Sequence, residues 1–148
     1  MKAVIQRVSQ ASVTVNGQVT GQINEGLLIL LGIKSGDHEK QADWLADKIV
    51  NLRIFPDAED KMNRSLLDVQ GEALIISQFT LYGDCERGRR PSFVEAARPE
   101  EAQPLYDYFV KQIHDCGIRT ATGVFQAMMD VTLTNSGPVT IIVETKQS

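Results

Sequence analysis

The sequence is poor in histidine and cysteine, two side chains that often act in catalysis and in metal binding. Its 148 residues include two histidines and two cysteines, and it has no apolar run as long as a membrane-spanning helix requires. The thiols, Cys85 and Cys116, lack the spacing of a metal site. The amino-terminal residues do not resemble a secretion signal, so we expect a cytoplasmic protein with free thiols.

Sequence motifs of the common catalytic sites are absent as well. There is no glycine-rich phosphate loop, no His-Glu-x-x-His motif and no Gly-x-Ser-x-Gly elbow. His38 lies in a polar stretch where we expect it to be solvated, and His114 lies near a helix end that favours positive charge. An enzyme with this sequence would therefore not depend on a strong side-chain base.

The charge is acidic overall but has one basic concentration. A net charge of −4 argues against general adhesion to nucleic acid. Arg87, Arg89 and Arg90 nevertheless form the densest positive cluster of the chain. Two interpretations remain open for this cluster, a solvated surface and a contact for phosphate groups, whose oxygens match the guanidinium fork.

The hydrophobic pattern predicts one α/β domain over residues 1–148. The length is sufficient for a buried core, and Asn16-Gly17 between two β-type runs is a strong hairpin signal. The run 27–31 is entirely apolar, as in a central strand. A helix is expected over 39–52 and a second one from about Pro104 to 116. Further strands are expected at 2–8, 11–15, 65–69, 73–81, 118–122, 130–135 and 139–145.

Two polar stretches stand out beside the apolar runs. Ser77-Gln78-Phe79-Thr80-Leu81 ends an apolar strand, and Asn135-Ser136-Gly137-Pro138-Val139-Thr140 precedes the last one. Polar groups at the end of a buried strand need partners, because each unpaired one costs about 1–3 kcal/mol. They either bond to neighbouring backbone or line a site.

Together with several other segments, these stretches closely resemble the D-aminoacyl-tRNA deacylase family. The resemblance extends over the whole chain. The other segments that carry it are Ile5-Gln6-Arg7-Val8, Arg53-Ile54-Phe55, Arg90-Pro91-Ser92-Phe93 and Leu105-Tyr106-Asp107-Tyr108-Phe109.

The resemblance implies a fold and an activity. We expect a compact α/β subunit of layered mixed β-sheets with two main helices packed on one side. We expect a homodimer with an active site at each interface and with no metal or organic cofactor. The implied reaction cleaves the ester of D-aminoacyl-tRNA, and of glycyl-tRNA(Ala), and leaves L-aminoacyl-tRNA intact.

The resemblance also assigns roles to individual residues. Gly137 and Pro138 match a Gly-cisPro pair that enters the partner's site and rejects L-amino acids, and Arg7 matches the arginine that holds this pair. Phe125 and Met129 match positions near the terminal adenosine. The catalytic segment is Ser77, Gln78, Phe79 and Thr80.

Physical reasoning favours backbone groups over the Thr80 hydroxyl as the catalytic element. Backbone N–H groups near Phe79 and Thr80 can stabilise an oxyanion, and the 2′-hydroxyl of the tRNA lies beside the ester. A threonine hydroxyl is a weak nucleophile without an adjacent base, so we expect Thr80 to orient or to support the segment.

Two alternatives remain open from the sequence alone. One is a β-rich RNA-binding module without catalysis, which would need neither Ser77–Leu81 nor Gly137-Pro138. The other is a general esterase in which Cys85 meets a histidine in space. Alkylation of the thiol would abolish that esterase and leave a deacylase active.

Overall fold

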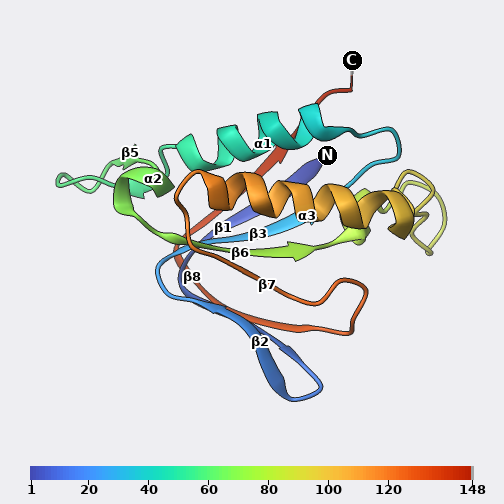
Figure 1. Ribbon diagram of the computed structural model, residues 1–148, viewed down its shortest axis with the longest axis horizontal. Helices are drawn as coiled ribbons and strands as arrows, with labels where there is room; N and C mark the ends of the chain where they lie inside the picture. The colour runs from blue at the N-terminus through green and yellow to red at the C-terminus, as the bar shows by residue number, and fades with distance from the viewer. Residues whose placement is uncertain (148) are drawn as a thin grey trace.

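The long first strand, β1 (Lys2–Val15), organises the sheet in a computed structural model that describes residues 1–147 (Figure 1). Its first half pairs antiparallel with β3 (Gly26–Gly32), and its second half with β2 (Gln18–Ile23). The last strand, β8 (Asp130–Glu144), runs antiparallel beside both halves. The prediction of separate strands at 2–8 and 11–15, and at 130–135 and 139–145, is wrong. β1 and β8 are each continuous, and their pairing is only irregular near the predicted breaks.

The hairpin between β1 and β2 forms as the sequence predicts. Asn16 and Gly17 both have positive φ angles, 50° and 77°, which is the conformation that a tight two-residue hairpin turn requires. The strands on either side pair directly, with Val15 opposite Gln18.

The other strands extend the sheet in parallel. β6 (Glu72–Ser77) pairs parallel with β3, and β7 (Thr120–Thr122) pairs parallel with β6, which gives the order β2-β1-β3-β6-β7. Because these three strands are parallel, their carboxyl ends meet at one edge of the sheet. The segments that follow β6 and β7 therefore emerge beside each other.

Two helices, α1 (Glu39–Asn51) and α3 (Pro99–Asp115), cover one face of the sheet (Figure 1). The larger core lies between them and the strands, and it includes Ile5, Ile29, Leu45, Ile75 and Phe109. The opposite face carries a second core of Val8, Val13, Ile23, Leu28, Leu74 and Ile76. This layered α/β arrangement confirms the predicted fold class. Within residues 1–147, no helix is long and apolar enough to cross a membrane.

The strand predicted at 65–69 is wrong, since these residues form the short helix α2 (Leu66–Val69). The Asp68 N–H donates to Ser65 Oγ at 3.0 Å, and the Ser65 N–H donates to Asp68 Oδ2 at 2.8 Å. This reciprocal pair is a capping box, which starts a helix even where the residues that follow are apolar. The small hairpin β4 (Phe55–Pro56) and β5 (Met62–Arg64) precedes it.

The predicted start of the second long helix near Pro104 is also wrong. α3 begins five residues earlier, at Pro99, where a proline costs nothing because first-turn N–H groups lack helical partners. Pro104 removes one further helical bond, to the carbonyl of Glu100, and that residue is exposed to water. Burial of Ala102 and Leu105 against the sheet outweighs the loss.

The close approach of β3 to β6 generates a stability prediction. A Cβ atom added to Gly26 would lie 1.8 Å from the carbonyl oxygen of Glu72, which belongs to the neighbouring backbone. We expect Gly26→Ala to lower the free energy of unfolding by about 3 kcal/mol or more, because the two strands must separate. Urea denaturation measures the change.

Gly17→Ala is the matched control. Its Cβ would have no atom within 4 Å, so only the positive φ opposes it, at about 1–2 kcal/mol. An equal loss in both variants would contradict the role given to the β3–β6 contact.

Candidate functional site

The segment after β6 leaves the sheet in a single tight turn. The strand stops at Ser77, earlier than predicted, and the Gln78 N–H donates to the carbonyl of Leu31 at 2.8 Å. The next residues form the 3₁₀ turn η1 (Phe79–Tyr82). The predicted strand 73–81 is therefore a strand that ends at Ser77, followed by a turn beyond the carboxyl end of β6.

The first N–H groups of η1 point to no protein acceptor. Its bonds begin with the N–H of Leu81, which donates to the Gln78 carbonyl at 3.2 Å. The N–H groups of Phe79 and Thr80 have no partner among residues 1–147, and both residues are exposed. The Gln78 side-chain amide donates to the Thr80 hydroxyl. Two adjacent free backbone donors can bind a developing negative charge.

Contacts from β1 and from the loop after η1 hold the turn in place. Lys2 Nζ donates to the carbonyl of Leu81 at 3.3 Å and lies 4.9 Å from the centre of the Tyr82 ring. The Phe79 and Phe93 rings pack edge to face, with their centres 5.1 Å apart. Burial raises the pKa of the Tyr82 hydroxyl above its ordinary value, so this side chain stays neutral. No local pattern around Lys2 predicts this role.

The loop that follows β7 lies at the same edge of the sheet, since β7 is parallel to β6. Phe125 in this loop has its ring centre 6.1 Å from that of Tyr106, and Met129 packs against the second core. A cavity of about 460 Å³ lies between this loop and α3. Its lining includes Phe125, Tyr106, Gln103 and Gly123. Phe125 and Met129 thus lie at the same edge of the sheet as the Ser77–Thr80 segment.

The second predicted stretch forms a protruding loop within β8. Gln6 pairs with Thr140 and Val8 pairs with Asn135, so residues 136–139 stand outside the ladder opposite Arg7. Arg7 Nε donates to the Ser136 carbonyl at 3.0 Å, and its Nη1 donates to the Ile54 carbonyl at 2.7 Å. One guanidinium therefore ties this loop to the segment after α1.

Asn135, the residue that precedes the loop, also supports it. The Val139 N–H donates to Asn135 Oδ1 at 2.9 Å, and Asn135 Nδ2 donates to the Thr140 hydroxyl at 2.9 Å. The Gly137–Pro138 peptide bond is cis, and both residues are exposed. A Cβ on Gly137 would lie 2.8 Å from Arg7 Nη2, so a glycine suits this position.

The two stretches lie far apart in one chain. Arg7 is level with Leu27 of β3, and Ser77 is level with Leu31 of the same strand. Four residues correspond to about 13 Å along the strands, and two strand spacings add about 10 Å across them. The fold thus brings Phe125 and Met129 to the edge where Ser77–Thr80 lie, and it keeps Gly137 and Pro138 away from them.

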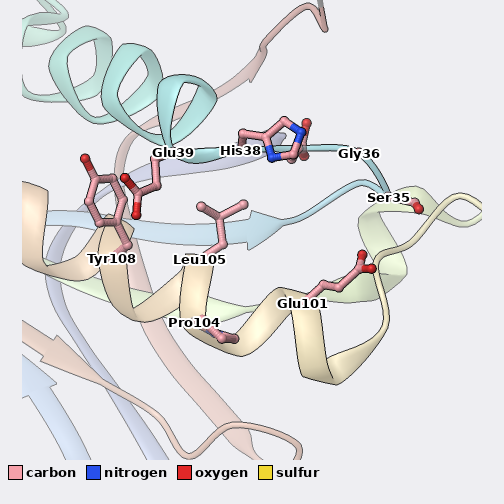
Figure 2. Close-up of a pocket in the computed structure, with 9 residues that line it drawn as sticks. Ser35, Gly36, His38, Glu39, Glu101, Pro104, Leu105 and Tyr108 are labelled. Carbon is pink, nitrogen blue, oxygen red and sulfur yellow. The ribbon is translucent and has the colours of Figure 1, made fainter.

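Another cavity of about 450 Å³ contains none of the predicted site residues (Figure 2). It lies between the start of α1 and α3, and its lining includes His38, Glu39, Glu101 and Tyr108. Within the described residues, no group of three or more His, Cys, Asp or Glu side chains is close enough to hold a metal ion.

The comparisons with protein families and with curated proteins agree with each other. Residues 4–144 match the family model described as D-Tyr-tRNA(Tyr) deacylase. A curated relative from Geotalea uraniireducens, named D-aminoacyl-tRNA deacylase, is 60% identical over 148 residues, which are 100% of this chain and 96% of that protein.

Two solved structures have the same fold. One, titled c-Myc DNA Unwinding Element Binding Protein, has a TM-score of 0.93 and 40% identity over 99% of this chain and 100% of its own. The other, a probable eukaryotic D-amino acid tRNA deacylase, has a TM-score of 0.83 over 96% of this chain and 97% of its own, at 16% identity.

The role of Arg7 as a clamp for the loop can be tested by Arg7→Lys. A lysine keeps the charge but cannot hold both carbonyls with the spacing of Nε and Nη1. Because a bond to a charged group contributes about 1.5–3 kcal/mol, amide exchange at Val139 should accelerate about tenfold or more. Hydrogen exchange followed by NMR measures it. Arg119→Lys, next to β7 and separated from β1 and β8 by β6 and β3, is the control. Unchanged exchange at Val139 in Arg7→Lys would refute the clamp.

Proposed function

Since the chain belongs to the D-Tyr-tRNA(Tyr) deacylase family, we propose that it hydrolyses the ester between a D-amino acid and the terminal adenosine of tRNA. Membership makes the chain an enzyme, a hydrolase of esters. The observation that supports the detailed proposal best is the pair of free N–H groups at Phe79 and Thr80. The substrate places the enzyme in the cytoplasm, with the aminoacyl-tRNA pool.

Chemically, the two N–H groups serve as an oxyanion hole. Water attacks the carbonyl carbon of the ester, and the negative charge that develops on the carbonyl oxygen is stabilised by the donors of Phe79 and Thr80. The bond to the ribose 3′-oxygen then breaks, and this oxygen receives the proton that the attacking water gives up. The neighbouring 2′-hydroxyl is positioned to assist this transfer. One such donor can contribute about 10²–10³ in rate, which suffices for an already activated ester.

The side chains of the turn have supporting roles. The Thr80 hydroxyl accepts a hydrogen bond from the Gln78 amide, so it is engaged within the turn. Residues 1–147 offer it no other hydrogen-bond partner that could act as a base. Ser77 and Gln78 fix the point at which the chain leaves β6. Phe125 and Met129 form the side of the site that receives the terminal adenosine.

We propose that the complete site needs a second copy of the chain. Val4, Leu30 and Ile142 make an apolar patch on the sheet face opposite the helices, and Ile142 is 69% exposed. Along the strands this patch lies between η1, which is level with Lys2, and the Gly137–Pro138 loop, which is level with Arg7.

A two-fold axis through this patch exchanges the two ends. Each copy then presents its Gly137–Pro138 loop to the η1 turn of the other, which closes the distance that one chain cannot close. Such a self-complementary contact is the usual geometry of a homodimer, and it covers the exposed Ile142.

In this dimer the partner's loop acts as the chiral filter. Arg7 and Asn135 fix the shape of this loop. Its backbone carbonyls bind the substrate amino group, and the loop occupies the direction that an L side chain would take. This is specificity by steric rejection. Glycine has no side chain to reject, so glycyl-tRNA(Ala) is accepted as a substrate.

A second candidate function is nucleic-acid binding without catalysis. It is favoured by the name of the solved relative that is 40% identical, which describes a protein that binds a DNA element. The two functions differ in one direct observation: a binding module retains tRNA and releases no amino acid from it.

The backbone oxyanion hole predicts different outcomes for two substitutions at one position. Phe79→Pro removes the N–H donor, in a first-turn position that tolerates proline, whereas Phe79→Ala removes only the ring. We expect Phe79→Pro to lower kcat on D-tyrosyl-tRNA by about 10²–10³ relative to Phe79→Ala. Single-turnover hydrolysis measures this difference. Equal rates in the two variants would eliminate the Phe79 N–H as a catalytic group.

The chiral filter predicts a gain of an unwanted activity. Wild-type protein treated with a chelator should release D-tyrosine from tRNA and spare the L ester. Pro138→Ala should hydrolyse L-tyrosyl-tRNA as well, because the loop no longer blocks the L side chain, and its rate on the D ester should change little. Pro104→Ala, at an exposed position on α3, is the matched control for the loss of a proline. If L-tyrosyl-tRNA stays fully protected in Pro138→Ala, the filter lies elsewhere.

A further inference from the structure

The arginine cluster occupies the tip of a paired loop. Asp84 and Ser92 exchange two backbone hydrogen bonds, of 2.7 and 2.9 Å, which close the segment between them into a hairpin-like loop. Gly88 has a φ of +66° at its centre, which allows the chain to reverse there. We refer to residues 84–92 as the arginine loop, which is drawn at the right of Figure 1, between η1 and α3.

The guanidinium groups of this loop are available for a ligand. Arg87, Arg89 and Arg90 are exposed, and none has an ion pair or hydrogen bond with another of residues 1–147. The nearby Asp84 carboxylate is engaged with the backbone, where it accepts a bond from the Glu86 N–H at 3.0 Å. Three unpaired arginines in an acidic protein make a local site for anionic groups.

The loop is fixed beside the candidate site. Phe93 follows the last residue of the loop, and the centre of its ring lies 5.1 Å from that of Phe79. The Phe93 ring is also close to Gly83, where an added Cβ would lie 3.0 Å from it. Only one residue separates the end of η1 from Asp84. The base of the loop therefore lies against the turn that carries the two free N–H groups.

From this placement we infer that the arginine loop binds the phosphates of the single-stranded 3′ end, just before the terminal adenosine. The inference rests on the proposed function. The tip lies four residues from Asp84, at most about 14 Å away. A stacked strand advances about 3.4 Å per nucleotide, so the tip reaches the phosphates of the last few nucleotides when the ester is at Phe79. The contacts are with the backbone and carry no sequence preference.

The test compares two substrates that share the same ester. D-tyrosyl-tRNA carries the phosphates, and the D-tyrosyl ester of adenosine has none. The variant is Arg87→Gln/Arg89→Gln/Arg90→Gln, and its control is Lys48→Gln/Lys61→Gln/Lys111→Gln, which removes three exposed charges elsewhere. Thermal unfolding checks that both variants fold.

We expect the arginine variant to act on the adenosine ester as the wild type does and to lose kcat/KM on the tRNA ester. Each single-strand phosphate contact contributes about 0.7 to the salt dependence, so the slope of log(kcat/KM) against log(salt) should become shallower by about 2. The lysine control should keep both the wild-type rate and the wild-type slope.

Two results would overturn the inference. An unchanged slope on tRNA would mean that the arginines do not contact phosphate. An equal loss on both substrates would mean that the loop only supports η1. Failure of the wild-type protein to cleave either D ester is a different result, which would refute the proposed function and, with it, the inference.

Discussion

The spacing of two side chains along β1 determines where the two halves of the proposed site lie. Lys2 binds the Leu81 carbonyl in the η1 turn, and Arg7 binds the Ser136 carbonyl in the β8 loop. Five residues of extended strand separate them by about 17 Å. Because β1 is paired on both sides over this length, that distance is rigid. A site that uses both halves must therefore obtain one of them from another copy of the chain.

The same arrangement explains how an acidic protein with few reactive side chains can act on an RNA ester. The proposed catalytic groups are backbone donors, which need no pKa adjustment and no histidine. The parallel strands β6 and β7 end at one edge and present the η1 turn and the Phe125 loop side by side. In the proposed function, positive charge is needed only where the strand of RNA leaves, which is the role we infer for the arginine loop. Weak attraction elsewhere would suit the proposed editing function, in which correctly charged tRNA is released.

Local signals allowed much of the fold to be predicted from the sequence. Asn16-Gly17 specified a hairpin, the apolar run 27–31 specified a central strand, and the stripe of α1 specified a helix. The errors came where two local signals competed. Ser65 and Asp68 form a capping box in an apolar stretch that resembled a strand, and the cost of Pro104 was outweighed by burial of Ala102 and Leu105.

The candidate site, like the fold, could be predicted only in part from the sequence. Its two polar stretches were visible in the sequence and carried the resemblance to the family. Contacts between residues distant in the chain were not visible, since they depend on strand order. Lys2 on Leu81, Arg7 on Ile54 and Phe79 on Phe93 are of this kind. A lysine at position 2 has no property in the sequence that distinguishes it from a solvated one.

The central claim, that each site combines the η1 turn of one copy with the Gly137–Pro138 loop of the other, is tested most directly by mixed dimers. Pro138→Ala protein, which has an intact turn, is refolded together with an excess of Phe79→Pro protein, which has an intact loop. The mixed dimer pairs the working turn with a working loop, so hydrolysis of L-tyrosyl-tRNA should disappear while hydrolysis of D-tyrosyl-tRNA remains. If L-tyrosyl-tRNA is cleaved as fast in the mixture as by Pro138→Ala alone, the loop acts within its own chain and the account is wrong.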